Sequence, residues 1–155
     1  ESLLKDGKIR SYGVSNFDVR GMEEAVRLSP GIACNQILYN LEERTIEHAV
    51  IPWCEKHGVA VVAYPPYGHG EFPGPHTPGG KVLQEIAAHH GATPRQVALR
   101  FLLRWPNLFT IPKASSPEHA EENAGAGDLR LSTAELSQID RAFPLGPKPR
   151  TLPVL

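Results

Sequence analysis

A strand-to-helix junction is encoded by the stretch Ile111-Pro112-Lys113-Ala114-Ser115-Ser116-Pro117-Glu118-His119-Ala120-Glu121-Glu122-Asn123. The apolar run 108–111, flanked by two prolines, predicts a short buried strand. Ser116 followed by Pro117 predicts an N-cap with proline at the first helical position. The stretch therefore places Lys113 and two serine hydroxyls between the end of a strand and the start of a helix.

Such a junction suits a phosphate group. Unpaired backbone N–H groups and the helix dipole both favour an anion at a helix N-terminus, and Lys113 adds a positive charge. The same residues would also form an ordinary capped helix beside a solvated lysine, which is the more frequent outcome for such a pattern. Taken alone, the stretch leaves both interpretations open.

Length and composition limit the classes of protein to consider. The chain has 155 residues, 41% of them hydrophobic, and a net charge of −1, which is enough for one domain with a sizeable core. Near-neutral charge argues against a nucleic-acid partner, and no apolar run approaches the roughly 20 residues of a membrane span. We see no signal peptide. The chain begins at Glu1, in what looks like the end of a helix, so we expect a fragment.

Two cysteines, Cys34 and Cys54, are too few for a disulfide framework. Both lie in apolar runs, which predicts buried thiols and a reducing, cytoplasmic location. The histidines His69 and His76 have no carboxylate or cysteine partner at a spacing typical of a metal site, so we expect no metal.

Predicted strands and helices alternate along the whole chain. Strands are predicted at 8–14, 32–39, 59–64 and 108–111, and helices at 1–5, 18–28, 51–57, 81–90, 93–105 and 132–143, with a further helix that starts at Ser116. The third strand is apolar without alternation, as expected of a parallel strand that is covered on both faces. Residues 65–80, with five prolines and five glycines, predict a long loop that lies over a ligand or is mobile. Residues 144–155 form a proline-rich tail, predicted to be extended.

Four strands alternating with helices imply an α/β fold with a parallel sheet. No Gly-x-Gly-x-x-Gly follows any predicted strand, which argues against a Rossmann domain. Four such units could make an open sheet or one half of a (β/α)8 barrel, which typically needs about 250 residues. The pattern of elements does not choose between them.

Several motifs, in their order and spacing, resemble those of the aldo-keto reductases. They are Gly13-Val14-Ser15-Asn16-Phe17, Asn35-Gln36-x-x-Tyr39 and the stretch from Pro112 to Asn123. The resemblance runs from Gly7 to Phe143 and is poor in the tail. It implies that residues 1–155 are a partial aldo-keto reductase domain, namely the C-terminal half (strands five to eight with their helices) of a TIM-type (β/α)8 barrel.

The resemblance implies a nicotinamide site made of Ser15, Asn16, Gln36 and Tyr64. In the family the first three hydrogen-bond the carboxamide, and the tyrosine ring stacks on the nicotinamide. We expect Gln36 to be buried, and a buried amide needs hydrogen-bonding partners that a carboxamide supplies. Without the resemblance, these residues would be interpreted as strand-end polar groups and a core aromatic ring.

The resemblance also implies a site for the 2′-phosphate and adenine, made of Lys113, Ala114, Ser115, His119, Glu122 and Asn123. Lys113 corresponds to the lysine that meets the 2′-phosphate. Many members carry an arginine where this chain has His119, and an imidazole is only partly charged near neutrality. We therefore expect NADP(H) as cofactor, with a weaker preference over NAD(H) than in relatives that have the arginine.

Tyr67 and Gly68 correspond to the start of the segment that folds over the cofactor's pyrophosphate. The family usually has a serine where this chain has Pro65, which offers neither a hydroxyl nor an N–H group. The contact of this position with the pyrophosphate is therefore not carried over.

The implied function is reduction of aldehydes or ketones, with a small carbonyl compound as substrate of the full-length parent. Nothing in this sequence matches the family's Asp-Tyr-Lys-His tetrad, so the chain contains no predicted catalytic residue and should be inactive alone. The alternative is an inactive half-barrel that binds a nucleotide or associates with a second copy through its open sheet edges.

Overall fold

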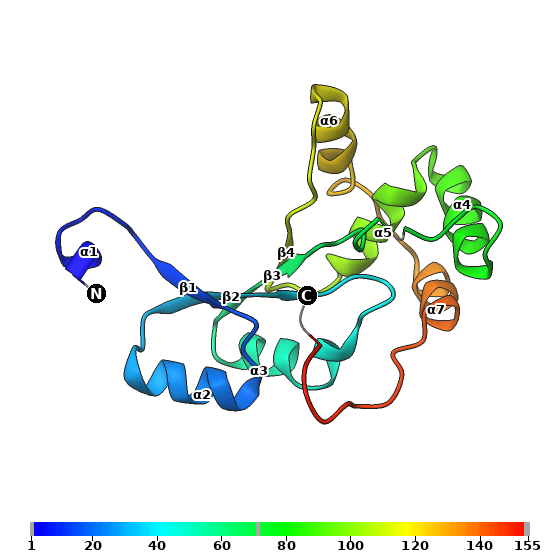
Figure 1. Ribbon diagram of the computed structural model, residues 1–155. Helices are drawn as coiled ribbons and strands as arrows, with labels where there is room; N and C mark the ends of the chain where they lie inside the picture. Colours follow the sequence, from blue (N-terminus) through cyan, green and yellow to red (C-terminus); the bar gives the residue numbers. More distant parts are fainter. Residues whose placement is uncertain (1, 71, 154–155) are drawn as a thin grey trace.

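The computed structural model describes residues 2–70 and 72–153, in which strands and helices alternate (Figure 1). The strands are β1 (Tyr12–Ser15), β2 (Ile32–Leu38), β3 (Ala60–Tyr64) and β4 (Leu108–Thr110). The helices are α1 (Ser2–Lys5), α2 (Val19–Leu28), α3 (Val50–Lys56), α4 (Pro78–His90), α5 (Pro94–Leu102), α6 (Pro117–Gly125) and α7 (Thr133–Ala142), and a 3-10 helix, η1 (Thr45–His48), precedes α3. This order confirms the predicted α/β alternation.

The four strands form one parallel sheet in the order β1-β2-β3-β4. Ser15 lies opposite Gln36, and Leu38 lies opposite Tyr64. Parallel pairing brings the carboxyl ends of the strands to one edge of the sheet. The residues predicted to bind a cofactor after β1, within β2 and at the end of β3 are therefore gathered at this edge.

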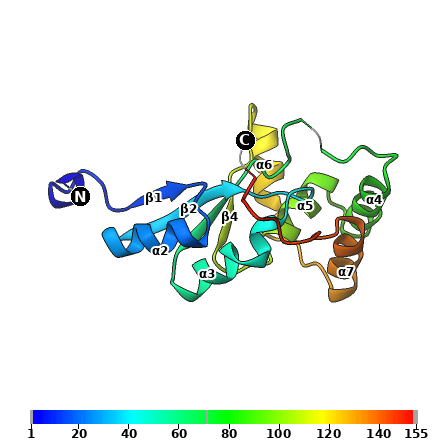
Figure 2. The ribbon, with the colours of Figure 1, turned by 60° about the horizontal axis from the view of Figure 1, so that its bottom comes forward.

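One face of the sheet is covered and the other is open. α2 and α3 lie on the same side of the sheet (Figures 1 and 2). Val61 and Ala63 are buried on this side, whereas Val62 and Tyr64 are only half-buried on the other. The prediction that the third strand is covered on both faces is thus wrong, because no described segment packs over the second face. Cys34, predicted to be buried, is partly exposed, and Cys54 is buried.

Side-chain caps begin the helices where the sequence predicts them. The Asp18 carboxylate accepts a hydrogen bond from the N–H of Gly21 at 2.7 Å, and the Ser116 hydroxyl accepts one from the N–H of His119 at 3.3 Å. The two predicted capping boxes, at the starts of α5 and α7, are both formed. Each cap satisfies backbone donors that the first helical turn leaves unpaired, which fixes the starting residue of the helix.

Three predicted boundaries are wrong by several residues. The first strand begins at Tyr12 and not at residue 8, because pairing with β2 starts there, at Ile32. α4 begins at Pro78 and not at residue 81, because the Thr77 hydroxyl caps it. α5 ends at Leu102, and the indole of Trp105 lies beyond it, 3.3 Å from the hydroxyl oxygen of Tyr39.

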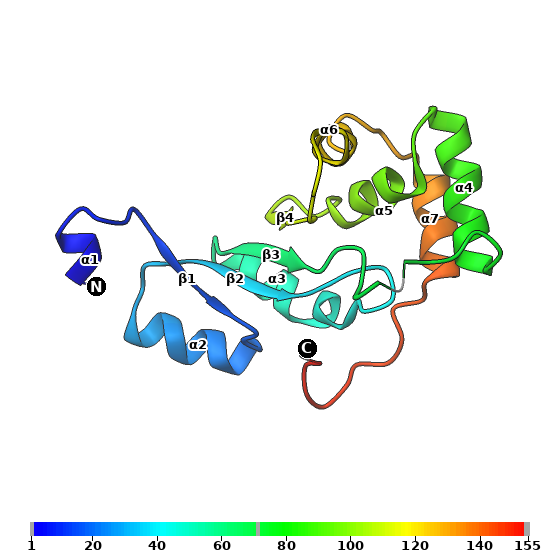
Figure 3. The same cartoon turned by 45° about the horizontal axis from the view of Figure 1, so that its top comes forward.

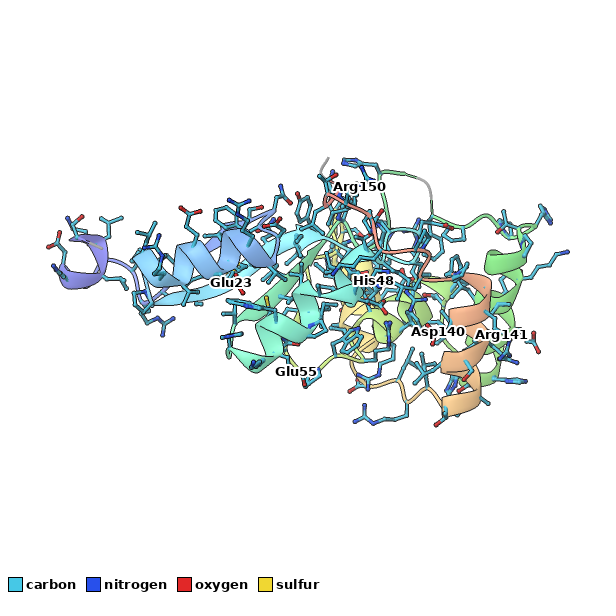
Figure 4. The ribbon with its side chains drawn as sticks, turned by 90° about the horizontal axis from the view of Figure 1, so that it is seen from below. Glu23, His48, Glu55, Asp140, Arg141 and Arg150 are labelled. Atoms are coloured by element: carbon cyan, nitrogen blue, oxygen red, sulfur yellow. The ribbon has the colours of Figure 1, made fainter. Side chains whose placement is uncertain are left out.

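The carboxylate of Glu47 joins a network of charged groups that the sequence analysis does not anticipate. It accepts hydrogen bonds from Arg44 at 2.8 Å, from Arg104 at 2.6 Å and from the Tyr39 hydroxyl at 2.7 Å. Arg44 also donates to Asp140 of α7 at 2.6 Å, and Figure 4 labels Asp140. The network ties η1 to the turn after α5 and to α7, which packs alongside α4 (Figure 3).

The proline-rich tail contains no helix or strand between residues 144 and 153. A ring nitrogen of His48 lies 3.2 Å from the carbonyl oxygen of Gly146, and Lys148, Arg150 and Leu152 share a cavity with His48 beside the start of α2 (Figure 4). The tail thus passes beside η1 without regular secondary structure among its described residues. Residues 1, 71, 154 and 155, which the sequence analysis includes in a helix, a loop and the tail, lie outside the described residues.

Candidate functional site

Ser15, Asn16, Gln36 and Tyr64 meet at the carboxyl ends of β1, β2 and β3. The Tyr64 hydroxyl donates a hydrogen bond to Oδ1 of Asn16 at 2.8 Å. The backbone carbonyl of Gln36 accepts two hydrogen bonds, from the Ser15 hydroxyl at 2.9 Å and from the Asn16 N–H at 2.8 Å. Residues from three separate stretches of sequence thus form one cluster of polar groups beside an aromatic ring, the strand-end cluster.

The backbone of Asn16 directs its side chain towards Tyr64. Its φ is 62°, and among the described residues it is the one non-glycine residue with a positive φ. Asparagine adopts this left-handed conformation more readily than other residues with a Cβ, because its short polar side chain can hydrogen-bond locally. The chain therefore turns sharply as it leaves β1.

The expectation that Gln36 is buried is wrong. Its side chain is exposed on the open face of the sheet, and the buried amide is that of its neighbour Asn35, which is 0% exposed. Asn35 donates to the carbonyl of Phe17 at 2.9 Å and accepts from the N–H of Phe17 at 3.4 Å. Because successive residues of a strand point to opposite faces, burying Asn35 directs Gln36 towards the open face.

A second group of predicted residues lines a cavity of about 210 Å³ between α5, α6 and the segment after β3, here termed the α6 pocket. Its lining is Tyr67, Arg95, Lys113, His119, Glu122 and Asn123. The Tyr67 hydroxyl donates to Oδ1 of Asn123 at 2.6 Å. Five of the six residues are ones that the sequence analysis assigns to the cofactor site.

Residues at the N-terminus of α5 hold Glu122 of α6 in place. The Thr93 hydroxyl donates to a carboxylate oxygen of Glu122 at 2.6 Å, and the Gln96 amide donates to the Glu122 backbone carbonyl at 2.8 Å. A Cβ on Gly125 would lie 2.6 Å from the Gln96 amide nitrogen, so a larger residue there would require the Gln96 side chain to move. The capping residues of α5 thus also position Glu122 in the α6 pocket.

Burial raises the pKa of the Tyr67 hydroxyl to about 12, with nearby Glu122 adding to the rise and Arg95 opposing it. Tyr67 is therefore protonated at physiological pH and acts as a hydrogen-bond donor. Its bond to Asn123 orients the asparagine amide, whose two N–H donors are on the other side of the group.

The Aldo/keto reductase family profile matches residues 1–143 of this chain. The chain belongs to the aldo/keto reductase family. It is 37% identical over 153 residues to methylglyoxal reductase YeaE of Escherichia coli, covering 97% of this chain and 54% of that protein. It is also 32% identical to glyoxal reductase of Bacillus subtilis over 158 residues, covering 98% of this chain and 54% of that protein.

Among solved structures, the fold resembles an aldo/keto reductase from Klebsiella pneumoniae in complex with NADP and acetate. The TM-score is 0.89 at 37% sequence identity, and the match covers 99% of this chain and 55% of that one. This aldo/keto reductase chain therefore spans about half the length of the relatives it matches.

Three residues assigned to the site lie in neither the strand-end cluster nor the α6 pocket. Ala114 and Ser115 are exposed in the segment between β4 and α6 and do not line the cavity. Gly68, with φ of +70°, lines a different cavity of about 190 Å³ at the ends of β2 and β3, which Tyr67 also borders. Tyr67 therefore separates the two cavities of this aldo/keto reductase chain.

Arg95 is the pocket residue that the sequence analysis misses. Its guanidinium carbon lies 4.8 Å from the ring centroids of both Tyr67 and Phe72. Arg95 lies between the two capping-box residues Thr93 and Gln96, and no local sequence pattern connects it with residues 113–123. Only the packing of α5 against α6 brings Arg95 into the same cavity as Lys113.

Two negative findings concern the part of the chain that the structure describes. Residues 2–70 and 72–153 contain no group of three or more histidine, cysteine or acidic side chains that could hold a metal ion. Within the same residues, none of the helices is long and apolar enough to cross a bilayer.

Proposed function

We propose that this chain is the C-terminal half of the (β/α)8 barrel of an aldo/keto reductase, containing strands five to eight, and that the full-length protein reduces aldehydes or ketones with NADP(H). The observation that carries the proposal is the α6 pocket, which unites Tyr67, Lys113, His119, Glu122 and Asn123. The relatives named methylglyoxal reductase and glyoxal reductase support a small carbonyl compound as substrate.

The chemistry of the α6 pocket fits adenosine 2′-phosphate. Lys113 provides a positive charge, and no described residue forms an ion pair with it. The Glu122 carboxylate can accept a hydrogen bond from the amino group of adenine, and the Asn123 amide can donate to a ring nitrogen. The NADP complex of the Klebsiella structure supports this cofactor, and we propose NAD(H) as a second, weaker one, because His119 is not a permanent cation.

The strand-end cluster fits the nicotinamide end of the cofactor. Ser15, Asn16 and Gln36 offer hydroxyl and amide groups that complement a carboxamide, and the Tyr64 ring offers a flat surface beside them. NADP(H), when bound, exchanges a hydride with the carbonyl carbon of the substrate. We propose that the residues of this chain bind and orient the cofactor, and that the proton donor comes from outside the chain, since the sequence has no match to the Asp-Tyr-Lys-His tetrad.

Calorimetric titration of the chain with NADPH and NADH tests the proposal. We expect Lys113→Ala to weaken NADPH binding about tenfold, because a charge-assisted contact to the 2′-phosphate is lost, and to leave NADH binding nearly unchanged. Lys56→Ala, at an exposed lysine of α3, is the matched control and should bind both cofactors like the wild type. Failure of the wild-type chain to bind either cofactor would contradict a nucleotide-binding role.

A second candidate function, self-association of an inactive half-barrel, is favoured by the open face of the sheet. Phe109 and Ile111 are 58% and 48% exposed, and Phe109 shares its face with Val62. The outer edges of β1 and β4 are unpaired among the described residues. Exposed apolar surface and unpaired strand edges both promote association.

Sedimentation velocity across a range of protein concentrations tests this second function. We expect a concentration-dependent dimer that Phe109→Ser combined with Ile111→Ser weakens. Leu28→Ser, which replaces a 67%-exposed leucine of α2, is the control and should leave the dimer intact. A chain that stays monomeric at every concentration would rule out self-association.

A further inference from the structure

Arg95 lies in the first turn of α5, in the wall of the α6 pocket opposite the segment that carries Lys113. Its guanidinium group packs against two aromatic rings of the segment after β3, with 4.8 Å from Cζ to each ring centroid. The rings of Tyr67 and Phe72 are themselves edge-to-face, 5.7 Å apart and 87° inclined. The guanidinium of Arg95 therefore contacts two rings of the same segment.

This arrangement leaves the hydrogen-bond donors of Arg95 available. A cation–π contact is made to the face of an aromatic ring, and it leaves the five N–H donors of the guanidinium without a hydrogen-bond acceptor of their own. No ion pair involves Arg95 among the described residues. Glu122, the acidic residue of the same pocket, already accepts a hydrogen bond from Thr93. Arg95 is thus a cation beside the cavity whose N–H donors have no hydrogen-bond partner among the described residues.

We infer that Arg95 binds the 2′-phosphate of NADP(H) together with Lys113. The inference rests on the proposed function, because it assigns one more residue to the same nucleotide pocket. An arginine at the position of His119 on α6 would offer the phosphate two parallel N–H donors, which an imidazole cannot do. Arg95 offers the same pair of donors from α5. The chain therefore keeps a strong preference for NADPH over NADH, in contrast to the weakened preference that His119 alone predicts.

The position of Arg95 favours the 2′-phosphate over the cofactor's pyrophosphate. Arg95 lines the 210 Å³ α6 pocket with Lys113, Glu122 and Asn123, the residues suited to adenosine. It does not line the 190 Å³ cavity at the ends of β2 and β3, which is bordered by Pro65 and Gly68. Tyr67 stands between the two cavities and turns one ring face to Arg95.

Three adenosine nucleotides separate these possibilities when they are titrated into the 155-residue chain by calorimetry. Adenosine 2′,5′-bisphosphate carries the 2′-phosphate, adenosine 5′-monophosphate lacks it, and adenosine 5′-diphosphate carries a pyrophosphate instead. The variants are Arg95→Gln, which removes the charge, Arg95→Lys, which keeps the charge without the fork, and Arg100→Gln, a control on the same helix outside the pocket.

We expect Arg95→Gln to raise the dissociation constant for the 2′,5′-bisphosphate about tenfold and to change that for the monophosphate by less than about twofold. Arg95→Lys should fall between Arg95→Gln and the wild type, and Arg100→Gln should match the wild type. Because the Arg95 side chain is exposed, these variants should keep the wild-type circular dichroism spectrum and unfolding temperature.

Each remaining outcome overturns the inference in a distinguishable way. If Lys113→Ala weakens binding of the 2′,5′-bisphosphate and Arg95→Gln does not, Arg95 has no role and the proposed function stands. If Arg95→Gln weakens binding of the 5′-diphosphate as much as binding of the 2′,5′-bisphosphate, Arg95 contacts the pyrophosphate instead. If the wild-type chain binds none of the three nucleotides, the proposed function and the inference both fail.

Discussion

The hydroxyl of Tyr64 donates a 2.8 Å hydrogen bond to Oδ1 of Asn16 and so joins the ends of two strands, β3 and β1, that are not neighbours in the sheet. β2 lies between them, and the backbone carbonyl of its Gln36 accepts a hydrogen bond from the N–H of Asn16. The strand-end cluster is therefore fixed by one side-chain contact across three strands and by one backbone conformation, φ of 62° at Asn16.

This relationship predicts different costs for two substitutions of Asn16. Asn16→Gly and Asn16→Ala both remove the hydrogen-bond acceptor, but only alanine must hold a Cβ at positive φ, which costs about 1 kcal/mol more. Tyr64→Phe removes the same hydrogen bond, keeps the ring and should cost about 1 kcal/mol. Urea unfolding measures all three. Equal stability of the Gly and Ala variants would show that the backbone conformation carries no strain.

Gly13→Ala should destabilise the chain by about 2 kcal/mol, because β1 approaches β2 too closely for a Cβ. An added Cβ would lie 2.4 Å from Sγ and 2.6 Å from the backbone oxygen of Cys34. Combining it with Cys34→Ala relieves only the first contact, so most of the loss should remain. Gly74→Ala is the control, since its Cβ would meet only Cγ2 of Thr77, at 3.9 Å. Equal thermal unfolding temperatures for Gly13→Ala and Gly74→Ala would refute this account of Gly13.

Glu47→Gln should cost about 3 kcal/mol at pH 7, because it leaves the buried Arg44 and the adjacent Arg104 without their common counter-charge. Glu55→Gln, at an exposed position of α3 (Figure 4), should cost little. Chemical denaturation of both variants beside the wild type gives the comparison. A loss for Glu47→Gln as small as that for Glu55→Gln would mean that the network adds no stability.

The stability difference between wild type and Glu47→Gln should depend on pH. Burial acts to raise the pKa of Glu47, but the hydrogen bond from Arg44 and the charge of Arg104 outweigh it, so the pKa is below its ordinary value. A carboxylate with a lowered folded-state pKa stabilises the fold above its unfolded pKa of about 4.3, and this contribution disappears as pH falls through the folded value. The difference should therefore be constant from pH 7 to about 5 and shrink below it. A constant difference down to the lowest pH would contradict the direction of this shift.

His119→Arg should tighten binding of adenosine 2′,5′-bisphosphate several-fold, because a guanidinium offers a phosphate a fixed bidentate fork that an imidazole lacks. His119 faces the α6 pocket with Lys113 and Arg95, so an arginine there would add a third permanent cation. His89→Arg, at an exposed position of α4, is the control and should leave binding unchanged. Unchanged binding of the 2′,5′-bisphosphate by His119→Arg would show that this position does not meet the 2′-phosphate.

The sequence by itself determined the elements whose signals are local. Asp18, Ser116 and the capping boxes of α5 and α7 fixed four helix starts, because a cap acts within one turn of the helix. The same locality explains why Lys113, His119, Glu122 and Asn123 could be grouped from the sequence. They lie within one strand-turn-helix unit, and helical spacing alone puts the last three on one face.

The tertiary structure decided what depends on how those elements pack. It turned Gln36 to the open face, because the neighbouring Asn35 bonds to Phe17 of another segment. It placed Arg95 against Tyr67, and it joined Glu47 to Arg104, 57 residues away. No local pattern encodes such contacts, since the burial of a polar group and the pairing of a charge are set by which distant surface covers it. Local chemistry thus gave this chain its elements and four of the six residues of the α6 pocket, and packing added Tyr67 and Arg95.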